Sequence, residues 1–185
     1  MSIVSPLVVL RSTTGCATTD SLSIAAKDTA PMANKIVTSS DALQFTIQTP
    51  HQRYTRGENI PLTGTLKNVG VTPQLVNGMF VLRRDTPEET GFGIAVHIQT
   101  STGQTLKYGI LYEMAGPSKD WFVTLETGAV FTREIHDMSS FLNQSSETGT
   151  YYLTAVYYNY IGRGLGLDPW MGQVRSNTLA IDIHE

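Results

Sequence analysis

Two stretches decide the fold of this chain: E-T-G-T-Y-Y-L-T-A-V-Y-Y (Glu147 to Tyr158) and G-Q-V-R-S-N-T-L-A-I-D-I (Gly172 to Ile183). In both, side chains suited to a protein core alternate with side chains suited to solvent, as in a strand with one buried face. Between them lies a glycine-rich, apolar loop, N-Y-I-G-R-G-L-G-L-D-P-W-M (Asn159 to Met171). The sequence therefore predicts a long terminal β-hairpin.

The same period of two continues upstream from Asp41 and predicts further strands. No segment longer than about ten residues has helical spacing, and Asp137 to Leu142 is predicted as a single helical turn capped by Asp137. Met79–Leu82 is apolar throughout, which favours a central strand covered on both faces. The predicted segments are Leu43–Ile47, Asn59–Asn68, Met79–Leu82, Ile94–Ile98, Leu106–Tyr112, Trp121–Leu125 and Val130–Ile135. The expected fold is all-β, an antiparallel sandwich of about seven to nine strands.

The composition limits the classes of function. A chain of 185 residues suits one domain plus a tail, and residues 41–185 would form that domain. The net charge is −3 and no run of Lys or Arg occurs, so the sequence does not predict a nucleic-acid partner. The single cysteine excludes an intramolecular disulfide. No apolar stretch reaches the roughly 18 residues that a membrane-spanning helix needs.

The first 40 residues are expected to form a leader and a tether. Residues 1–16, M-S-I-V-S-P-L-V-V-L-R-S-T-T-G-C, place an apolar run before a Gly-Cys pair. This resembles the end of a bacterial lipoprotein signal and makes Cys16 a candidate for lipidation. Arg11 follows the apolar run instead of preceding it, and Thr13 stands where the family usually has Leu. A disordered tail with an incidental cysteine and an ordinary signal peptide are the alternatives.

Residues 17–40 are rich in Ser, Thr and Ala and are predicted to be a flexible linker. With the leader, this predicts an extracytoplasmic protein of the cell envelope, secreted or anchored by lipid. A membrane contact is expected only through that anchor.

A family resemblance rests on Glu147-x-Gly149-x-Tyr151-x-Leu153. Immunoglobulin-like domains often carry acidic-x-Gly-x-Tyr-x-Cys here, and the tyrosine hydroxyl bonds back to upstream backbone. Tyr151 matches that tyrosine, and Leu153 stands in place of the cysteine. The likeness covers Gly128 to Ile183 and departs from the pattern upstream, where Met79–Leu82 lacks the usual Trp.

The chain is thus similar to non-catalytic immunoglobulin-like modules of secreted and cell-envelope proteins, including those beside extracellular proteases. It is also similar in kind to small bacterial proteinase-inhibitor sandwiches. The resemblance implies a disulfide-free sandwich and carries no activity.

The residue types that perform chemistry are present without the spacing that chemistry needs. The four histidines, His51, His97, His136 and His184, contain no H-x-x-x-H pair, and one cysteine cannot build a Cys-rich metal site. The serines near His136 lie in no G-x-S-x-G elbow.

Other catalytic patterns are missing as well. Glu113, Asp120, Glu126 and Glu134 are scattered along the chain, so the sequence shows no carboxylate pair of the kind that glycosidases use. Glycines at 162, 164 and 166 have the spacing G-x-G-x-G, and Asp168-Pro169 follows where a phosphate loop would begin a helix. We therefore expect a non-enzymatic protein without metal or cofactor.

The loop between the last strands is unusually apolar, and two interpretations of it stay open. Its side chains could form an adaptable contact surface at the end of the sandwich, or they could fold back over the core. The residues concerned are Ile161, Arg163, Leu165, Leu167, Trp170 and Met171.

The leading hypothesis is a binding module that recognises a protein partner through its end loops. Residues 161–171 would act together with Ala115–Lys119 or Arg84–Gly93, and proteinase inhibition is one version of this hypothesis. The alternative is a carbohydrate-binding or adhesion module that uses exposed aromatic side chains. The candidates for that role are Tyr108, Tyr112, Trp121, Tyr152, Tyr158 and Tyr160.

Overall fold

The computed structural model describes residues 42–83, 91–106, 116–142 and 147–185. The predictions for the leader, for Cys16 and for the linker lie outside these residues. The strands are β1 (Leu43–Gln48), β2 (Arg53–Thr55), β3 (Pro61–Asn68), β4 (Gln74–Asn77), β5 (Phe92–Thr100), β6 (Thr105–Leu106), β7 (Phe122–Leu125), β8 (Val130–Asp137), β9 (Gly149–Asn159), β10 (Gly172–Arg175) and β11 (Leu179–His184). Short helical turns are η1 (Lys119–Trp121), α2 (Ser139–Leu142) and η3 (Arg163–Leu165).

The eleven strands form three sheets. One has the order β1-β3-β8, and the larger has the order β2-β11-β9-β5-β6, with β10 also paired to β9. The third is the pair β4-β7. All pairs are antiparallel except β2 with β11. The prediction of a mostly β, antiparallel fold is therefore confirmed.

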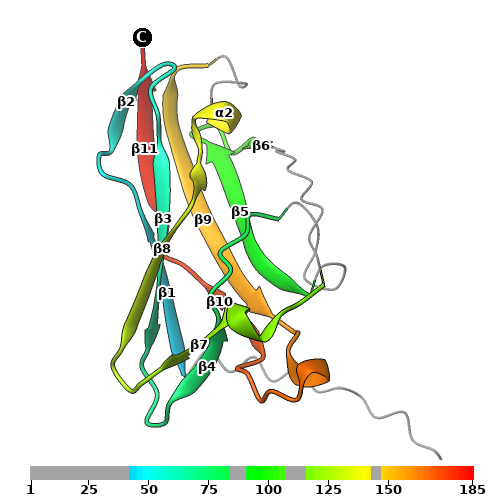
Figure 1. The fold of residues 1–185 in the computed structure, drawn as a ribbon. Coiled ribbons are helices and arrows are strands. Elements are labelled where there is room, and N and C mark those ends of the chain that lie inside the picture. Colours follow the sequence, from blue (N-terminus) through cyan, green and yellow to red (C-terminus); the bar gives the residue numbers. More distant parts are fainter. Residues whose placement is uncertain (1–41, 84–90, 107–115, 143–146) are drawn as a thin grey trace, which may run out of the picture. The chain divides into compact units, whose positions relative to one another are not determined.

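The two larger sheets lie face to face and share one core (Figure 1). The sheet β1-β3-β8 contributes the buried side chains of Leu43, Phe45 and Ile47 to this core. The larger sheet contributes those of Ile94, Val96 and Ile98 from β5. These six residues occupy the inward positions that the period of two predicted. Burying apolar side chains from both sheets is the main stabilising contribution available to such a fold. No helix in the described ranges is long and apolar enough to cross a membrane.

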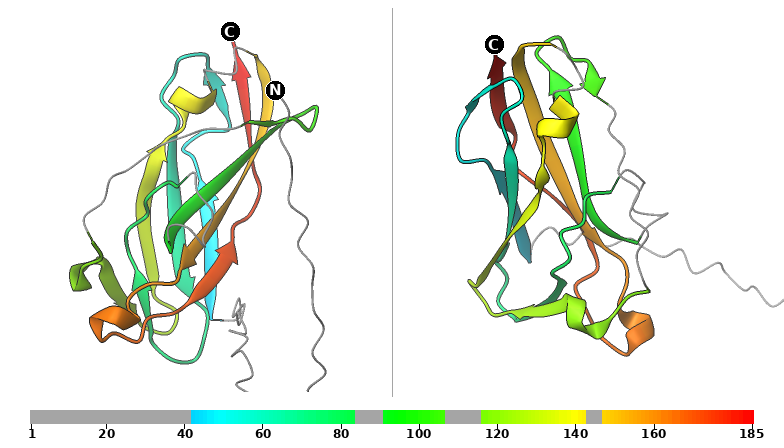
Figure 2. Two further views of the ribbon diagram at one scale, coloured as in Figure 1. Left: turned by 90° about the vertical axis from the view of Figure 1, so that its right-hand side faces the viewer. Right: turned by 45° about the horizontal axis from the view of Figure 1, so that its top comes forward.

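The strand β9 is central to the larger sheet. It pairs with β5 on one side from Tyr151 to Asn159, and with β11 and then β10 on the other. Figure 2 shows β5 and β9 side by side along most of their length. The closing stretch from Gly172 to Ile183 was predicted as one strand, but it is divided into β10 and β11.

The side chain of Asn177 explains where that division occurs. Its oxygen accepts a hydrogen bond from the backbone N–H of Ile47 at 2.8 Å, and its nitrogen donates to the Ile47 carbonyl at 3.1 Å. The amide thus binds the edge of β1 as a neighbouring strand would. The chain leaves the β9 ladder at this point and joins the two sheets.

The prediction of a central strand at Met79–Leu82 is wrong. Within it, only Leu82 forms a bridge, to Ile94. Phe80 and Leu82 are buried while Met79 and Val81 are partly exposed. The apolar run reflects ring packing, because Phe80 lies 6.0 Å from Phe45 and 5.5 Å from Phe131 between ring centroids. The neighbouring strand β4 was not predicted.

The predicted turn after β8 is present as α2, with Asp137 as its cap. The Asp137 carboxylate accepts hydrogen bonds from the Ser139 backbone N–H at 3.0 Å and from the Ser139 hydroxyl at 2.7 Å. It also accepts one from the Ile60 backbone N–H at 2.9 Å, which ties the start of β3 to the end of β8. The Asp137 side chain therefore joins the helical turn α2 to the sheet β1-β3-β8.

The start of β9 has the hydrogen bond that the resemblance implies for Tyr151. The Tyr151 hydroxyl donates to the carbonyl of Glu147, four residues upstream, at 2.7 Å. The ring is 2% exposed, and Leu153 is fully buried in the shared core. Gly149 has a φ of 137°, in the region that favours glycine.

We predict that Tyr151→Phe lowers the free energy of unfolding by about 1 kcal/mol, because it removes one partly buried hydrogen bond. Urea unfolding of the purified protein measures this change. Tyr152→Phe is the matched control, since Tyr152 is 42% exposed, and it should change stability by less than about 0.5 kcal/mol. Equal effects of the two changes would contradict a structural role for the Tyr151 hydroxyl.

We also predict a pH-dependent contribution from Asp137. Burial opposes ionisation of this carboxyl, but hydrogen bonds from Ser139 and Ile60 and the nearby His136 lower its pKa below 3.8. The stabilisation is therefore complete above the unfolded-state pKa and is lost as pH falls through the lower folded-state value. The difference in unfolding free energy between wild type and Asp137→Asn should shrink from about pH 6 to about pH 2.5. A difference that stays constant over that pH range would contradict a stabilising role for the ionised Asp137 carboxylate.

Candidate functional site

The loop from Tyr160 to Met171 is fixed at its base by Asn159, the last residue of β9. This side chain is fully buried, and its nitrogen donates to the carbonyls of Ile161 at 3.1 Å and of Trp170 at 3.0 Å. Its oxygen accepts a hydrogen bond from the Asn77 amide at 3.3 Å. Both ends of the loop are therefore held by one side chain, which is in turn held by the end of β4.

Trp170 belongs to the core, so for this residue the structure fits the interpretation that the loop folds back and not the contact-surface interpretation. The side chain is 6% exposed, and its ring stacks on Tyr157 with centroids 5.8 Å apart. Its backbone N–H donates to the Leu75 carbonyl at 2.8 Å. An indole is large enough to close the end of a sandwich, which is the physical reason for its burial. Its Nε1 is buried without a hydrogen-bond partner in the described part of the chain.

Tyr157, whose ring packs against Trp170, is itself held by two hydrogen bonds. The Tyr157 hydroxyl donates to the Asn77 carbonyl at 2.9 Å and accepts from the Asn77 N–H at 3.0 Å. Burial raises the pKa of this hydroxyl well above its ordinary value of 10.0. The group therefore stays protonated at neutral pH and can keep donating to Asn77.

Two of the three glycines in the loop, Gly162 and Gly166, have backbone conformations that favour glycine. Gly162 is buried with a φ of 114°, and a Cβ there would lie 2.7 Å from Pro169 Cγ and 2.9 Å from Phe122 Cζ. The chain can therefore pass this close to the start of β7 only without a side chain. Gly166 ends η3 in the left-handed conformation, with a φ of 72°. Gly164 has open space around it.

Four of the predicted loop residues come together around an apolar hollow of about 390 Å³. Ile161, Leu165 and Met171 are partly exposed there, and Arg163 is exposed beside them. Pro117, from the predicted neighbour Ala115–Lys119, also lines the hollow, as does Tyr160. Leu167 is partly exposed but is not one of the lining residues.

Of the second predicted neighbour, residues 84–90 lie outside the described structure. Gly91 does contact the loop, because its carbonyl accepts a hydrogen bond from the Tyr160 N–H at 2.6 Å.

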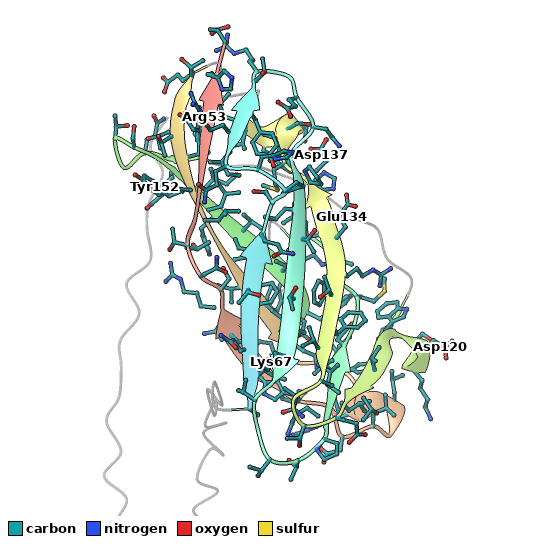
Figure 3. All side chains as sticks on the ribbon, turned by 90° about the vertical axis from the view of Figure 1, so that its left-hand side faces the viewer. Arg53, Lys67, Asp120, Glu134, Asp137 and Tyr152 are labelled. Carbon is teal, nitrogen blue, oxygen red and sulfur yellow. The ribbon has the colours of Figure 1, made fainter. Side chains whose placement is uncertain are left out.

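The histidine and carboxylates that an enzyme would use are placed apart. Asp137 is engaged as a cap, and the His136 ring lies 5.5 Å from the Phe141 ring. Figure 3 shows Asp120 and Glu134 on well-separated parts of the fold. Among the residues that the structure describes, no group of three or more His, Cys, Asp or Glu could hold a metal ion.

The aromatic candidates for carbohydrate binding do not form an exposed row within the described ranges. Tyr158 is fully buried, and Trp121 is partly buried against Phe92, 5.4 Å away between centroids. Tyr152 is exposed on the outer face of β9 and points away from the sheets in Figure 3. Tyr108 and Tyr112 lie outside the described residues.

A second hollow, of about 350 Å³, lies around Tyr152. The sequence pattern did not predict this grouping of residues. The hollow combines outward-facing residues of β5, β9 and β10, among them His97, Thr154 and Arg175. Alternation along each strand identifies outward positions, but the grouping depends on strand order and register. Strand order and register cannot be derived from a single sequence by alternation alone.

No protein-family model and no curated protein sequence matches this chain. The immunoglobulin-like family therefore remains a resemblance of sequence pattern. The functional argument rests on the geometry of the described residues.

We predict that Asn159→Ala lowers the free energy of unfolding by about 3 kcal/mol, because the buried Trp170 carbonyl, the part-buried Ile161 carbonyl and the Asn77 amide lose their partner. Chemical unfolding measures the loss, and hydrogen exchange at the Trp170 N–H should accelerate. Gln173→Ala is the control, since that side chain is exposed on β10, and it should be close to neutral. A near-neutral Asn159→Ala would mean that the loop does not depend on this amide.

Proposed function

We propose that this chain is an immunoglobulin-like sandwich that binds a protein partner through the hollow beside the 160–171 loop, without making or breaking bonds. In such domains the first, second and fifth strands share one sheet, and the last two strands share the other with the third. The order β1-β3-β8 and the order β11-β9-β5 support this proposal: with the short strands set aside, β8 would take the place of the fifth strand. The hydrogen bond of Tyr151 to Glu147 supports the same proposal.

The observation that carries the binding proposal is a preformed apolar hollow at a loop whose base is fixed. Asn159 and Trp170 hold the loop before any partner arrives, so binding would cost little ordering entropy. Apolar residues in a concave site favour an inserted side chain of a partner. An extracytoplasmic location is part of the proposal and rests on the expected leader and on Cys16 as a candidate for lipidation.

The charge at the hollow suggests the chemistry of the partner. Arg163 is exposed and makes no ion pair with any described residue. A guanidinium at the edge of an apolar site favours a carboxylate beside the inserted group. The expected recognition element is therefore a large apolar side chain next to Asp or Glu.

Proteinase inhibition receives less support than general binding. Residues 163–165 form a 3-10 turn, η3, whereas a segment that adds to a protein as a strand is extended. We therefore propose that the hollow receives a group of its partner.

Selection from a library of unstructured displayed peptides would test this function. We predict enrichment of a large apolar residue adjacent to Asp or Glu. Binding of the resulting synthetic peptide, followed by fluorescence anisotropy, should weaken at least about tenfold in Leu165→Ser and in Arg163→Gln, because each removes one part of the complementary surface.

Val130→Ser is the matched control, since Val130 is an exposed apolar residue on β8. It should leave peptide affinity unchanged. Absence of enrichment, or equal affinities of wild type and Leu165→Ser, would contradict binding at the hollow.

A further inference from the structure

The outer face of the larger sheet carries side chains that suit a ligand different from the one proposed for the end loop. The hollow there is formed mainly by neighbouring strands, and Thr178, between β10 and β11, completes its lining. In the pairing of β5 with β9, Tyr152 lies beside Gln99 and Thr154 lies beside His97. In the pairing of β10 with β9, Arg175 lies beside Val156. Because residues two apart on a strand share a face and are about 7 Å apart, these pairs form three successive rows.

Arg175 reaches from its own row toward the middle of the face. Its Nη2 donates to the Thr154 hydroxyl oxygen at 3.4 Å. The guanidinium is thereby brought next to the row that holds His97, and Tyr152 lies one row further along β9. A cation and an exposed aromatic ring therefore border the same hollow.

The charges around this hollow favour an anion. Among the residues that the structure describes, its lining contains Arg175 and His97 and no carboxylate. Arg175 makes no ion pair with any residue that the structure describes. Asp182, on the neighbouring strand β11, is engaged by Arg53 at 3.4 Å. A carboxylate of a ligand would meet a guanidinium whose planar donors suit it.

The remaining groups favour a ligand rich in hydroxyls. Gln99, Thr154 and Thr178 offer amide and hydroxyl groups, which can both donate and accept hydrogen bonds. Val156 is the one aliphatic residue in the described part of the lining, which offers little for an inserted apolar peptide side chain to pack against. Tyr152 is 42% exposed and offers a ring on which the face of a sugar can lie.

We propose that this face binds a saccharide that carries a carboxylate, such as a uronic acid unit of a polysaccharide. Arg175 holds the carboxylate, Tyr152 packs against the sugar ring, and His97, Gln99 and Thr154 bind its hydroxyl groups. The site is independent of the hollow at the 160–171 loop and uses none of its residues.

Isothermal titration calorimetry with trigalacturonate tests the proposal on the full chain. Trigalacturonate should bind, and its methyl ester, which is neutral, should bind at least about tenfold more weakly, because it lacks the charge for Arg175. Arg175→Gln and Tyr152→Ala should each weaken binding by a similar factor. Both side chains are exposed, and circular dichroism would show that the two variants are folded.

Arg163→Gln is the matched control, because it removes an exposed arginine from the other hollow. It should leave trigalacturonate binding unchanged, while Arg175→Gln should leave peptide binding at the end loop unchanged. The two proposals can thus fail separately.

Four results would overturn the saccharide site. They are no binding of trigalacturonate up to about 10 mM, a range that would still reveal weak binding; equal binding of the methyl ester; full affinity in Arg175→Gln; and competition by acetate or inorganic phosphate at the same concentration as trigalacturonate. The last would show a general anion site without sugar recognition.

Discussion

The buried hydrogen bonds among Tyr157, Asn77 and Asn159 hold the end of this molecule together. Tyr157 bonds to both backbone groups of Asn77, and the Asn77 side chain bonds to Asn159. Asn159 in turn bonds to the carbonyls of Ile161 and Trp170. In an apolar core each of these groups would be costly to bury alone, so they stabilise the fold only as a set. The position of β4, the burial of Trp170 and the shape of the loop all depend on this set.

The strand β9 contributes to both the core and the outer surface because of its alternation. Tyr151, Leu153, Ala155 and Tyr157 point into the core and are at most 2% exposed. Tyr152 and Thr154 point outward, where the core places no demand on their size or polarity. The inward half of the strand therefore determines the fold, while the outward positions of Tyr152 and Thr154 can be chosen for a ligand. The same division explains why a sequence pattern that predicts the strand says little about what it binds.

The sequence predicted the features that depend on neighbours along the chain. The inward residues of β1 and β5 and the cap at Asp137 follow from local spacing, and the hydrogen bond of Tyr151 follows from the family resemblance. The predictions failed where contacts between residues far apart in the sequence determine the structure. Met79–Leu82 is apolar because Phe80 meets Phe45 and Phe131, and not because both faces of a strand are covered.

The candidate sites show the same limit. The sequence left open whether Trp170 belongs to a contact surface or to the core, and its stacking on Tyr157, thirteen positions earlier, places it in the core. Arg175 and His97 are 78 positions apart, and only the register of β5, β9 and β10 places them on one face. Asn177 likewise binds β1 across 130 positions. Such pairings are fixed by strand order, which local patterns do not determine.

The glycine-rich loop shows why composition alone misjudges mobility. Three glycines in five residues suggest a flexible segment, since glycine loses the most conformational freedom on folding. In the structure, Gly162 is packed against Pro169 and Phe122, and Gly166 supplies a left-handed end to η3. Asn159 and Trp170 hold the two ends of the loop. The glycines therefore allow a tight backbone path that leaves Ile161, Leu165 and Met171 around one hollow. A loop already ordered in this way loses less entropy on binding than a flexible loop of the same sequence length would.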